Sequence, residues 1–279
     1  MLNNVHIIGL GLMGTNLGIN LVNLGVNVSG YDTNIDSIER AEKLGAVNIS
    51  HNVDLTYDAV VLAMPIDQII EFLSIKNLNL KSKLLIDLGG TKEIICKKMN
   101  SFEIPSVGGH PLCGVADNEN WKSNPEIYLG APFLLCETES SSKESMAIAE
   151  ALVETIGSKF KWIDSNKHDE LIGLTSHLPH IISSSLVSLA MKEQNLNELL
   201  DLASGGFDGA TRLSRTSPNM ISSMYLTNSP NVRQLIEKLI NELQLVLNME
   251  DEEVMLDYLS GTVDWRRALA EKFGERELS

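Results

Sequence analysis

The N-terminal part of the chain alternates short apolar runs with segments of helical periodicity. The predicted strands lie at residues 5–8, 26–31, 58–63, 83–88, 132–136 and 159–163. The predicted helices lie at residues 12–24, 35–44, 68–73, 92–99 and near 143–156. Strands that alternate with helices in this way are typical of a doubly wound parallel sheet, so we expect an α/β domain.

The pattern changes after about Ser165, where strand signals cease. Long helical periodicities follow over residues 167–191 and 232–248 and from 252 toward 272. We therefore predict two domains, residues 1–164 with the α/β fold and an all-α domain over residues 165–279. The helical part carries more Leu, Ile and Met on its faces than a small bundle usually hides, which indicates a homodimer built on these helices.

Composition narrows the possible partners. The chain has 279 residues, 43% of them hydrophobic, and a formal net charge of −15. This charge disfavours partners bound by phosphate neutralisation, so we expect neither a nucleic-acid nor a membrane partner. No apolar run approaches the roughly 20 residues that a membrane helix needs, and the chain enters a strand directly without a basic leader. The three cysteines have no zinc-ligand spacing and leave one unpaired, which suits a reducing cytoplasm.

A glycine pattern, Gly9-Leu10-Gly11-Leu12-Met13-Gly14, follows the first strand and opens the first helix. In this context the glycines allow a tight turn, close approach of the backbone to a pyrophosphate, and close packing of helix on strand. The helix N-terminus then offers unpaired N–H groups to the phosphates. The first domain is therefore expected to be a Rossmann-type dinucleotide-binding domain. Its predicted cofactor site comprises Gly9, Gly11, Leu12, Met13, Gly14, Asp32 and Met64.

Asp32 ends the second predicted strand, where an acid can accept hydrogen bonds from the adenosine ribose hydroxyls. A 2′-phosphate would meet this carboxylate, and no Arg or Lys lies between Asp32 and Glu39 to offset the repulsion. We therefore expect NAD rather than NADP. A helix cap is the alternative role for Asp32. Flavin is disfavoured because a chain this short leaves little room for a flavin-capping domain.

Three further motifs occur in order behind the glycine pattern. They are Gly109-His110-Pro111-Leu112-Cys113-Gly114, Ser176-His177-Leu178-Pro179-His180 and the segment from Gly205 to Arg212, Gly-Gly-Phe-Asp-Gly-Ala-Thr-Arg. Together they resemble the prephenate and arogenate dehydrogenases, and the resemblance runs from the first strand to about Asn228. It implies a small cyclohexadienol substrate that loses a hydride and a carboxylate, leaving an aromatic ring.

His110 is the predicted catalytic base. Histidine, with an unperturbed pKa near ~6.5, suits the removal of a hydroxyl proton at neutral pH. His110 comes at the end of an apolar strand, where ligands bind in such sheets, although a lone histidine there is often structural. The resemblance favours catalysis, because the catalytic histidine of the family stands in this His-Pro motif.

The resemblance also implies three substrate-binding residues. His177 is expected to line the substrate pocket, and Arg212 is expected to bind a substrate carboxylate, which the planar guanidinium suits. An interhelical salt bridge is the alternative role for Arg212. His177 and His180 share a face of the predicted helix, but without a third ligand nearby they indicate no metal site, and His180 is expected to pack. Thr91 is expected to substitute for a serine of the family that is missing here.

The chain departs from the family pattern at several positions. Gly90 stands where the family has that serine, Val115 and Ala116 stand where many members have a polar pair, and Gly209 replaces a frequent acid. Lys92 fits the pattern but is also consistent with an exposed residue at a helix start. These changes bear on the polarity of the pocket and leave the reaction class intact.

The resulting interpretation is NAD-dependent oxidative decarboxylation of prephenate to 4-hydroxyphenylpyruvate. Arogenate is the alternative substrate. An acid at position 116 would favour its ammonium group, so Ala116 favours prephenate. A 3-hydroxyacid dehydrogenase should present a helical catalytic lysine, which is not found after Ser165. A non-enzymatic NAD-binding redox sensor is the alternative of a different class, because Gly90 and Gly209 replace polar residues.

Overall fold

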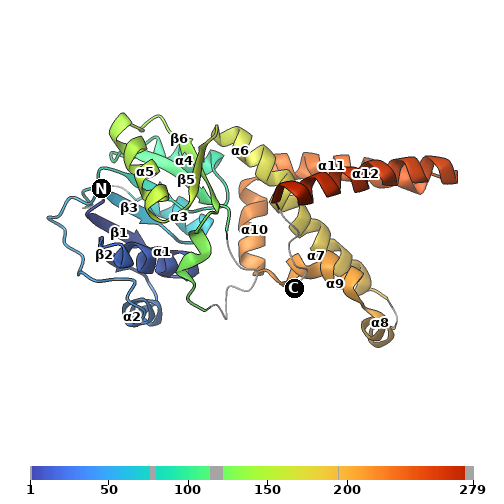
Figure 1. Ribbon diagram of the computed structural model, residues 1–279, viewed down its shortest axis with the longest axis horizontal. Coiled ribbons are helices and arrows are strands. Elements are labelled where there is room, and N and C mark those ends of the chain that lie inside the picture. The colour runs from blue at the N-terminus through green and yellow to red at the C-terminus, as the bar shows by residue number, and fades with distance from the viewer. Residues whose placement is uncertain (1, 76–79, 114–121, 194, 274–279) are drawn as a thin grey trace.

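The computed structural model describes residues 2–75, 80–113, 122–193 and 195–273 (Figure 1). Within these residues, seven strands form one sheet in the order β2-β1-β3-β4-β5-β6-β7. The strands are β1 (Asn4–Ile8), β2 (Asn27–Tyr31), β3 (Ala59–Leu62), β4 (Leu85–Asp87), β5 (Ser106–Pro111), β6 (Pro132–Glu137) and β7 (Lys159–Trp162). Every strand predicted above is present. The apolar strand expected just before His110 is β5, and it extends through His110 to Pro111.

The sheet is the predicted doubly wound type, and one of its strand pairs is antiparallel. The strands from β2 to β5 pair in parallel, but β6 pairs antiparallel with β5 and β7 runs parallel to β6. An apolar strand has the same sequence pattern in either direction, and the direction here depends on the connection between β5 and β6. The carboxyl ends of β1 to β5 nevertheless lie at one edge of the sheet, where a ligand site is expected.

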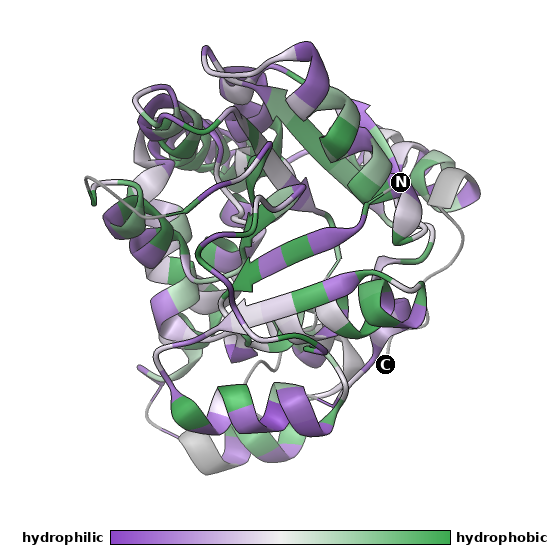
Figure 2. Cartoon of the chain, turned by 90° about the vertical axis from the view of Figure 1, so that its left-hand side faces the viewer, coloured by the Kyte–Doolittle hydropathy of each residue, from purple (hydrophilic) through white to green (hydrophobic). Residues whose placement is uncertain are grey.

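Helices cover both faces of this sheet. They are α1 (Leu12–Asn23), α2 (Ile35–Lys43), α3 (Ile66–Phe72), α4 (Glu93–Met99) and α5 (Lys143–Thr155), with a short 3₁₀ turn at Pro125–Tyr128. Helices at the periphery of Figure 2 alternate hydrophilic and hydrophobic residues, as amphipathic helices packed on a core do. Two clusters of buried side chains result, centred on Val5 and Ile7 and on Val60 and Leu62, whose side chains point to opposite faces.

The second domain is helical throughout its described residues, as predicted. Its elements are α6 (Ser165–Ile172), a π-helical turn (Gly173–His177), α7 (Leu178–Ala190), α8 (Leu196–Leu202), α9 (Gly205–Thr211), a 3₁₀ turn (Arg212–Arg215), α10 (Pro218–Thr227), α11 (Ser229–Leu247) and α12 (Glu252–Phe273). The periodicity over 167–191 predicts one helix, whereas the π-helical turn interrupts it. Helices α11 and α12 project from the molecule (Figure 1). None of the described helices has both the length and the hydropathy needed to cross a membrane.

The two domains are joined by packing and by hydrogen bonds. Met224 and Ile221 of α10 belong to the hydrophobic cluster beneath α3 and α4. At the same junction the Thr91 hydroxyl donates to the Thr227 hydroxyl at 3.1 Å. The side-chain amide of Asn228 donates to the main-chain oxygen of Asp169 on α6 at 2.8 Å. The carboxyl edge of the sheet therefore faces residues of the helical domain.

Candidate active site

The glycine loop after β1 has the geometry that the sequence predicts for phosphate binding. Gly9 adopts a φ of 99°, and a Cβ there would lie 2.5 Å from the carbonyl oxygen of Ala63. A Cβ on Gly14 would lie 1.9 Å from the carbonyl oxygen of Gly9, so both positions require glycine. A Cβ on Gly11 would meet no atom within 4 Å, which leaves open space for a ligand.

Helix α1 begins at this loop and leaves its N-terminal N–H groups available. Leu12 and Met13 open the helix, no side chain caps it at Gly11, and its first turn has no acidic residue. Met64 lies close by, since its backbone nitrogen is 3.0 Å from the Cβ position of Gly9. A pyrophosphate fits such a loop, because the N–H groups and the positive end of the helix dipole face it.

Asp32 stands just after β2, beside the glycine loop. Its Oδ2 accepts a hydrogen bond from the Leu10 backbone N–H at 2.7 Å, and its Oδ1 accepts one from the Asn34 N–H at 2.8 Å. The N-cap of α2 is Asn34, whose side chain accepts from the Asp36 N–H. The structure therefore gives the cap to Asn34 and leaves Asp32 partly exposed and fixed at the edge where a ribose is expected.

His110 lies near the end of β5, with its ring at the carboxyl edge of the sheet. Its Nδ1 is 2.9 Å from Nε2 of His168, and Nε2 of His110 has no hydrogen-bond partner among the described residues. Burial, followed by the nearby histidine and lysine side chains, lowers the pKa of His110 well below its usual value. The ring is therefore neutral at pH 7, as a proton acceptor must be.

His168 and Asp169 were not identified from the sequence, yet they contact the predicted base. Both lie on α6 and are buried, with exposures of 0% and 1%. His168 Nδ1 donates to Oδ1 of Asp169 at 2.7 Å. Asp169 also accepts the backbone N–H groups of Lys92 at 2.8 Å and Glu93 at 3.0 Å. A His-Asp pair just after a predicted domain boundary was the only sequence signal available for them.

A buried ion pair supports the strand ends beside His110. The ammonium of Lys92 pairs with Oδ2 of Asp87, and both side chains are fully buried. Asp87 also accepts the backbone N–H groups of Gly89 at 2.8 Å and Gly109 at 3.0 Å. Buried charges are tolerated when they are paired and hydrogen-bonded in this way. Lys92 is therefore not an exposed residue at a helix start, the alternative that the sequence left open.

Position 90 leaves space next to the base. A Cβ on Gly90 would lie 3.9 Å from Nε2 of His110 and 4.0 Å from Cδ1 of Ile66, which is ordinary van der Waals contact. Thr91 is fully buried, and its hydroxyl donates to Thr227. Its role in substrate binding stays a prediction, because this hydroxyl is engaged between the domains.

His177 is buried in the π-helical turn. Its Nδ1 is 3.1 Å from the side-chain amide of Asn228, while its Nε2 has no hydrogen-bond partner among the described residues. Burial lowers the pKa of His177 to about 4, so the ring is neutral at pH 7. Because Nδ1 accepts from the amide, Nε2 carries the proton and is a buried donor without an acceptor. His180 instead lies on α7, with Nδ1 2.9 Å from the Ser176 carbonyl oxygen.

Arg212 follows α9 and is exposed. Among the described residues it forms no ion pair, so the interhelical salt bridge that the sequence left open is absent there. Gly209, in the exposed part of α9, has open space around its Cβ position. Val115 and Ala116 lie outside the described residues.

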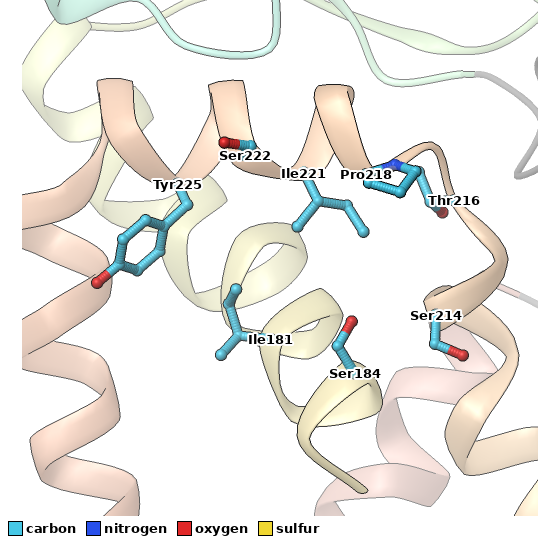
Figure 3. A pocket seen from close by; sticks show the side chains of 8 residues that line it. All are labelled: Ile181, Ser184, Ser214, Thr216, Pro218, Ile221, Ser222 and Tyr225. Atoms are coloured by element: carbon cyan, nitrogen blue, oxygen red, sulfur yellow. The ribbon is translucent and has the colours of Figure 1, made fainter. Parts of the chain in front are cut away.

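A separate pocket of about 340 Å³ lies within the helical domain (Figure 3). It opens between α7 and α10, and none of the predicted site residues lines it. The lining residues are Ile181, Ser184, Ser214, Thr216, Pro218, Ile221, Ser222 and Tyr225. Its lining has no titratable group suited to proton transfer near neutral pH, so we do not assign the chemistry to it.

Similar proteins match almost the whole chain. The chain is 28% identical to the prephenate dehydrogenase of Lactococcus lactis subsp. cremoris, over 96% of this chain and 78% of that protein. It is 25% identical to the cyclohexadienyl dehydrogenase of Zymomonas mobilis, over 95% of this chain and 96% of the relative. The crystal structure of A. aeolicus prephenate dehydrogenase with hydroxyphenyl propionate and NAD⁺ superimposes with a TM-score of 0.87 at 27% identity, covering 96% and 99% of the two chains.

Family models cover most of the chain. Residues 17–162 match the nucleotide-binding domain of prephenate dehydrogenase, and residues 164–260 match its dimerization domain. The matched ranges follow one another along the sheet domain and the helical domain described above. The chain therefore belongs to the prephenate dehydrogenase family.

Proposed function

We propose that the protein catalyses the NAD-dependent oxidative decarboxylation of prephenate to 4-hydroxyphenylpyruvate, a step of tyrosine biosynthesis. The observation that carries this proposal is the neutral, half-buried His110 at the sheet edge, whose Nε2 has no hydrogen-bond partner among the described residues and lies beside the space at Gly90. A general base in that position, beside a dinucleotide loop, suits the oxidation of an alcohol. The names of the relatives support the substrate class.

His110 acts on the hydroxyl group at C4 of the substrate. Nε2 accepts the hydroxyl proton as hydride leaves C4, and NAD, when bound at the glycine loop, supplies the hydride acceptor. The ring carboxylate leaves as CO₂, and the electron pair of the broken C–C bond completes the aromatic ring. The proton held on His110 is then available to the phenolic oxygen. The protein contributes mainly by positioning C4 and by excluding water.

Two residues of the helical domain are proposed to hold the rest of the substrate. His177 presents a buried N–H without an acceptor among the described residues, and a carboxylate or carbonyl oxygen of the substrate can satisfy it. Arg212 is exposed and without an ion-pair partner among the described residues, as a cation that binds a carboxylate from solution would be. Thr91 is proposed to contact the ring hydroxyl after a rearrangement of its bond to Thr227.

Arogenate dehydrogenase activity is the second candidate. It is favoured by the relative named cyclohexadienyl dehydrogenase, since a cyclohexadienol with an amino group in place of the keto group needs the same base and the same hydride transfer. The preference between prephenate and arogenate depends on whether an acid faces the side-chain ammonium of arogenate. Ala116, the residue that favours prephenate, carries no such acid.

We propose that the protein forms a homodimer through its helical domain. The supporting observation is the small core of that domain, whose buried hydrophobic residues are Ile172, Leu178, Ala190, Met224 and Val232. By contrast, Leu189, Leu202 and Leu247 are exposed by 59%, 76% and 82%. A second copy packed on these helices covers such side chains and the pocket between α7 and α10. We also propose a cytoplasmic location, because all three cysteines are free thiols.

One assay tests the proposed function. Purified protein is incubated with NAD or NADP and with prephenate or arogenate, while the reduced cofactor is followed. Turnover of prephenate with NAD supports the proposal, and a clear preference for arogenate replaces it with the second candidate. Binding of NADH without turnover of either substrate indicates the redox sensor instead.

A further inference from the structure

The hydrogen-bond partners of His110 determine which of its ring nitrogens carries the proton. Asp169 is an acceptor, because its two oxygens already accept backbone N–H groups from Lys92 and Glu93. His168 Nδ1, 2.7 Å from Oδ1 of Asp169, must therefore be a donor. In a neutral His168 the other nitrogen, Nε2, then has a free lone pair.

The same reasoning extends one step further to His110. Its Nδ1 lies 2.9 Å from Nε2 of His168, and two lone pairs cannot face one another at that distance. His110 Nδ1 must therefore carry the proton and donate it to His168. Nε2 of His110 is left with its lone pair, on the side of the ring near Gly90.

We propose that His168 and Asp169 are positioning residues that hold His110 in the tautomer whose Nε2 accepts the substrate proton. This inference rests on the proposed role of His110 as the base. It places both positioning residues on helix α6 of the helical domain. The tautomer of His110 is therefore fixed only when the two domains are docked. The main-chain oxygen of Asp169 is in turn held by Asn228, and the Asp169 carboxylate by the start of α4.

The charges around His110, His168 and Asp169 are consistent with a neutral His168. Burial lowers the pKa of His168, although the bond to Asp169 opposes the shift. The groups that face the pair are Lys92 with its partner Asp87, at the start of α4 and the end of β4, and His177 of the π-helical turn. None of them places a proton on Nε2 of His168.

The test is the protonation state of His110 in the ligand-free protein, by NMR of the full chain labelled with ¹⁵N-histidine at pH 7.5. The His110 ring signals are assigned by their loss in His110→Asn. We expect Nδ1 of His110 to be protonated and Nε2 to be unprotonated in the wild type. In His168→Met, which removes the acceptor, the Nε2–H tautomer should appear. His51→Gln, at an exposed histidine outside the site, should leave the His110 signals unchanged.

Kinetics give the second readout. His168→Met should lower kcat about 10- to 100-fold, because His110 then adopts the tautomer whose Nε2 is already protonated. KM should change less than about twofold, because the substrate contacts remain. His168→Gln, whose amide oxygen can accept from His110 Nδ1, should recover part of the loss. Protonation of Nε2 in wild-type His110, or wild-type kcat in His168→Met, overturns the inference. The NMR result needs no substrate, so it separates a failure of the inference from a failure of the proposed function.

Discussion

Gly90 leaves room for a side chain directly beside His110, since a Cβ at this position would be 3.9 Å from Nε2 of the ring. The backbone φ of Gly90 lies outside the left-handed region, so an L-residue fits without strain. The family pattern inferred from the sequence has a serine at this position, where this chain has no hydroxyl. The space beside Nε2 of His110 can therefore hold a side chain at position 90, and Gly90 supplies no hydrogen-bonding group there.

Gly90→Ser should improve the proposed reaction. A hydroxyl near Nε2 of His110 can hold the C4 hydroxyl of the substrate, and one net hydrogen bond is worth about 1 kcal/mol, or roughly a fivefold rise in kcat/KM. Initial rates with prephenate and NAD measure the effect. Gly90→Ala is the matched control, because it adds the Cβ without the hydroxyl. An equal change in both variants would assign the effect to packing.

Asp32 should make the protein prefer NAD over NADP by at least tenfold in kcat/KM. A 2′-phosphate would lie against this carboxylate, and ~1.4 kcal/mol of repulsion is enough for that ratio. Asp32→Ser combined with Thr33→Arg should relax the preference. Equal efficiency of the wild type with both cofactors contradicts the assignment of Asp32 to the ribose.

Arg212→Ala should raise the KM for prephenate while the affinity for NAD stays nearly unchanged. Loss of a hydrogen bond to a charged group costs about 1.5–3 kcal/mol, which corresponds to a rise of roughly 10- to 150-fold. Arg215→Ala, at another exposed arginine of the same 3₁₀ turn, is the matched control and should leave KM unchanged. A normal KM with lower thermal stability in Arg212→Ala makes the residue structural.

The stability of the fold should fall as the pH drops below 6.5. Burial lowers the pKa of both His6 and His177 to about 4, from 6.5 in the unfolded chain. Between these values the unfolded chain binds more protons, so unfolding becomes easier on acidification. From pH 7.5 to pH 5, each histidine should cost about 2 kcal/mol of unfolding free energy.

Urea unfolding at the two pH values measures this loss, and His6→Gln should reduce it by the share of one histidine. His6 lies between the ring of His51 and the hydroxyl of Ser29, so the substitution also lowers stability at pH 7.5. The informative quantity is therefore the difference in unfolding free energy between pH 7.5 and pH 5. An unchanged pH dependence in His6→Gln would falsify the assignment of this titration to His6.

The sheet domain and the glycine loop could be predicted from sequence because their signals are local. Each apolar run marks its own strand, and Gly9, Gly11, Gly14 and Asp32 all lie between the end of the first strand and the residue after the second. The antiparallel direction of β6 could not be predicted, because strand direction is not encoded in an apolar run.

The contact of His110 with His168 could not be predicted from the sequence, because it is not local. His110 and His168 are separated by 58 positions along the chain, and their contact depends on how the helical domain docks on the sheet. The π-helical turn that buries His177 also has no clear local signal. Its sequence continues an ordinary helical periodicity, and only the structure shows that Nε2 of His177 has no partner in the described part of the chain.

The most direct measurement for the central claim is the turnover of prephenate with NAD by His110→Asn, compared with the wild type. The variant should fold and bind NAD normally, and KM should move little, because asparagine still hydrogen-bonds the hydroxyl. It should lower kcat by ~10²–10⁴-fold, the range for loss of a positioned general base. In the wild type, kcat/KM should fall on acidification only below the usual range of histidine, because burial lowers the pKa of His110, and this limb should vanish in the variant. Turnover near the wild-type value with the same acid limb would contradict the account and remove His110 from the chemistry.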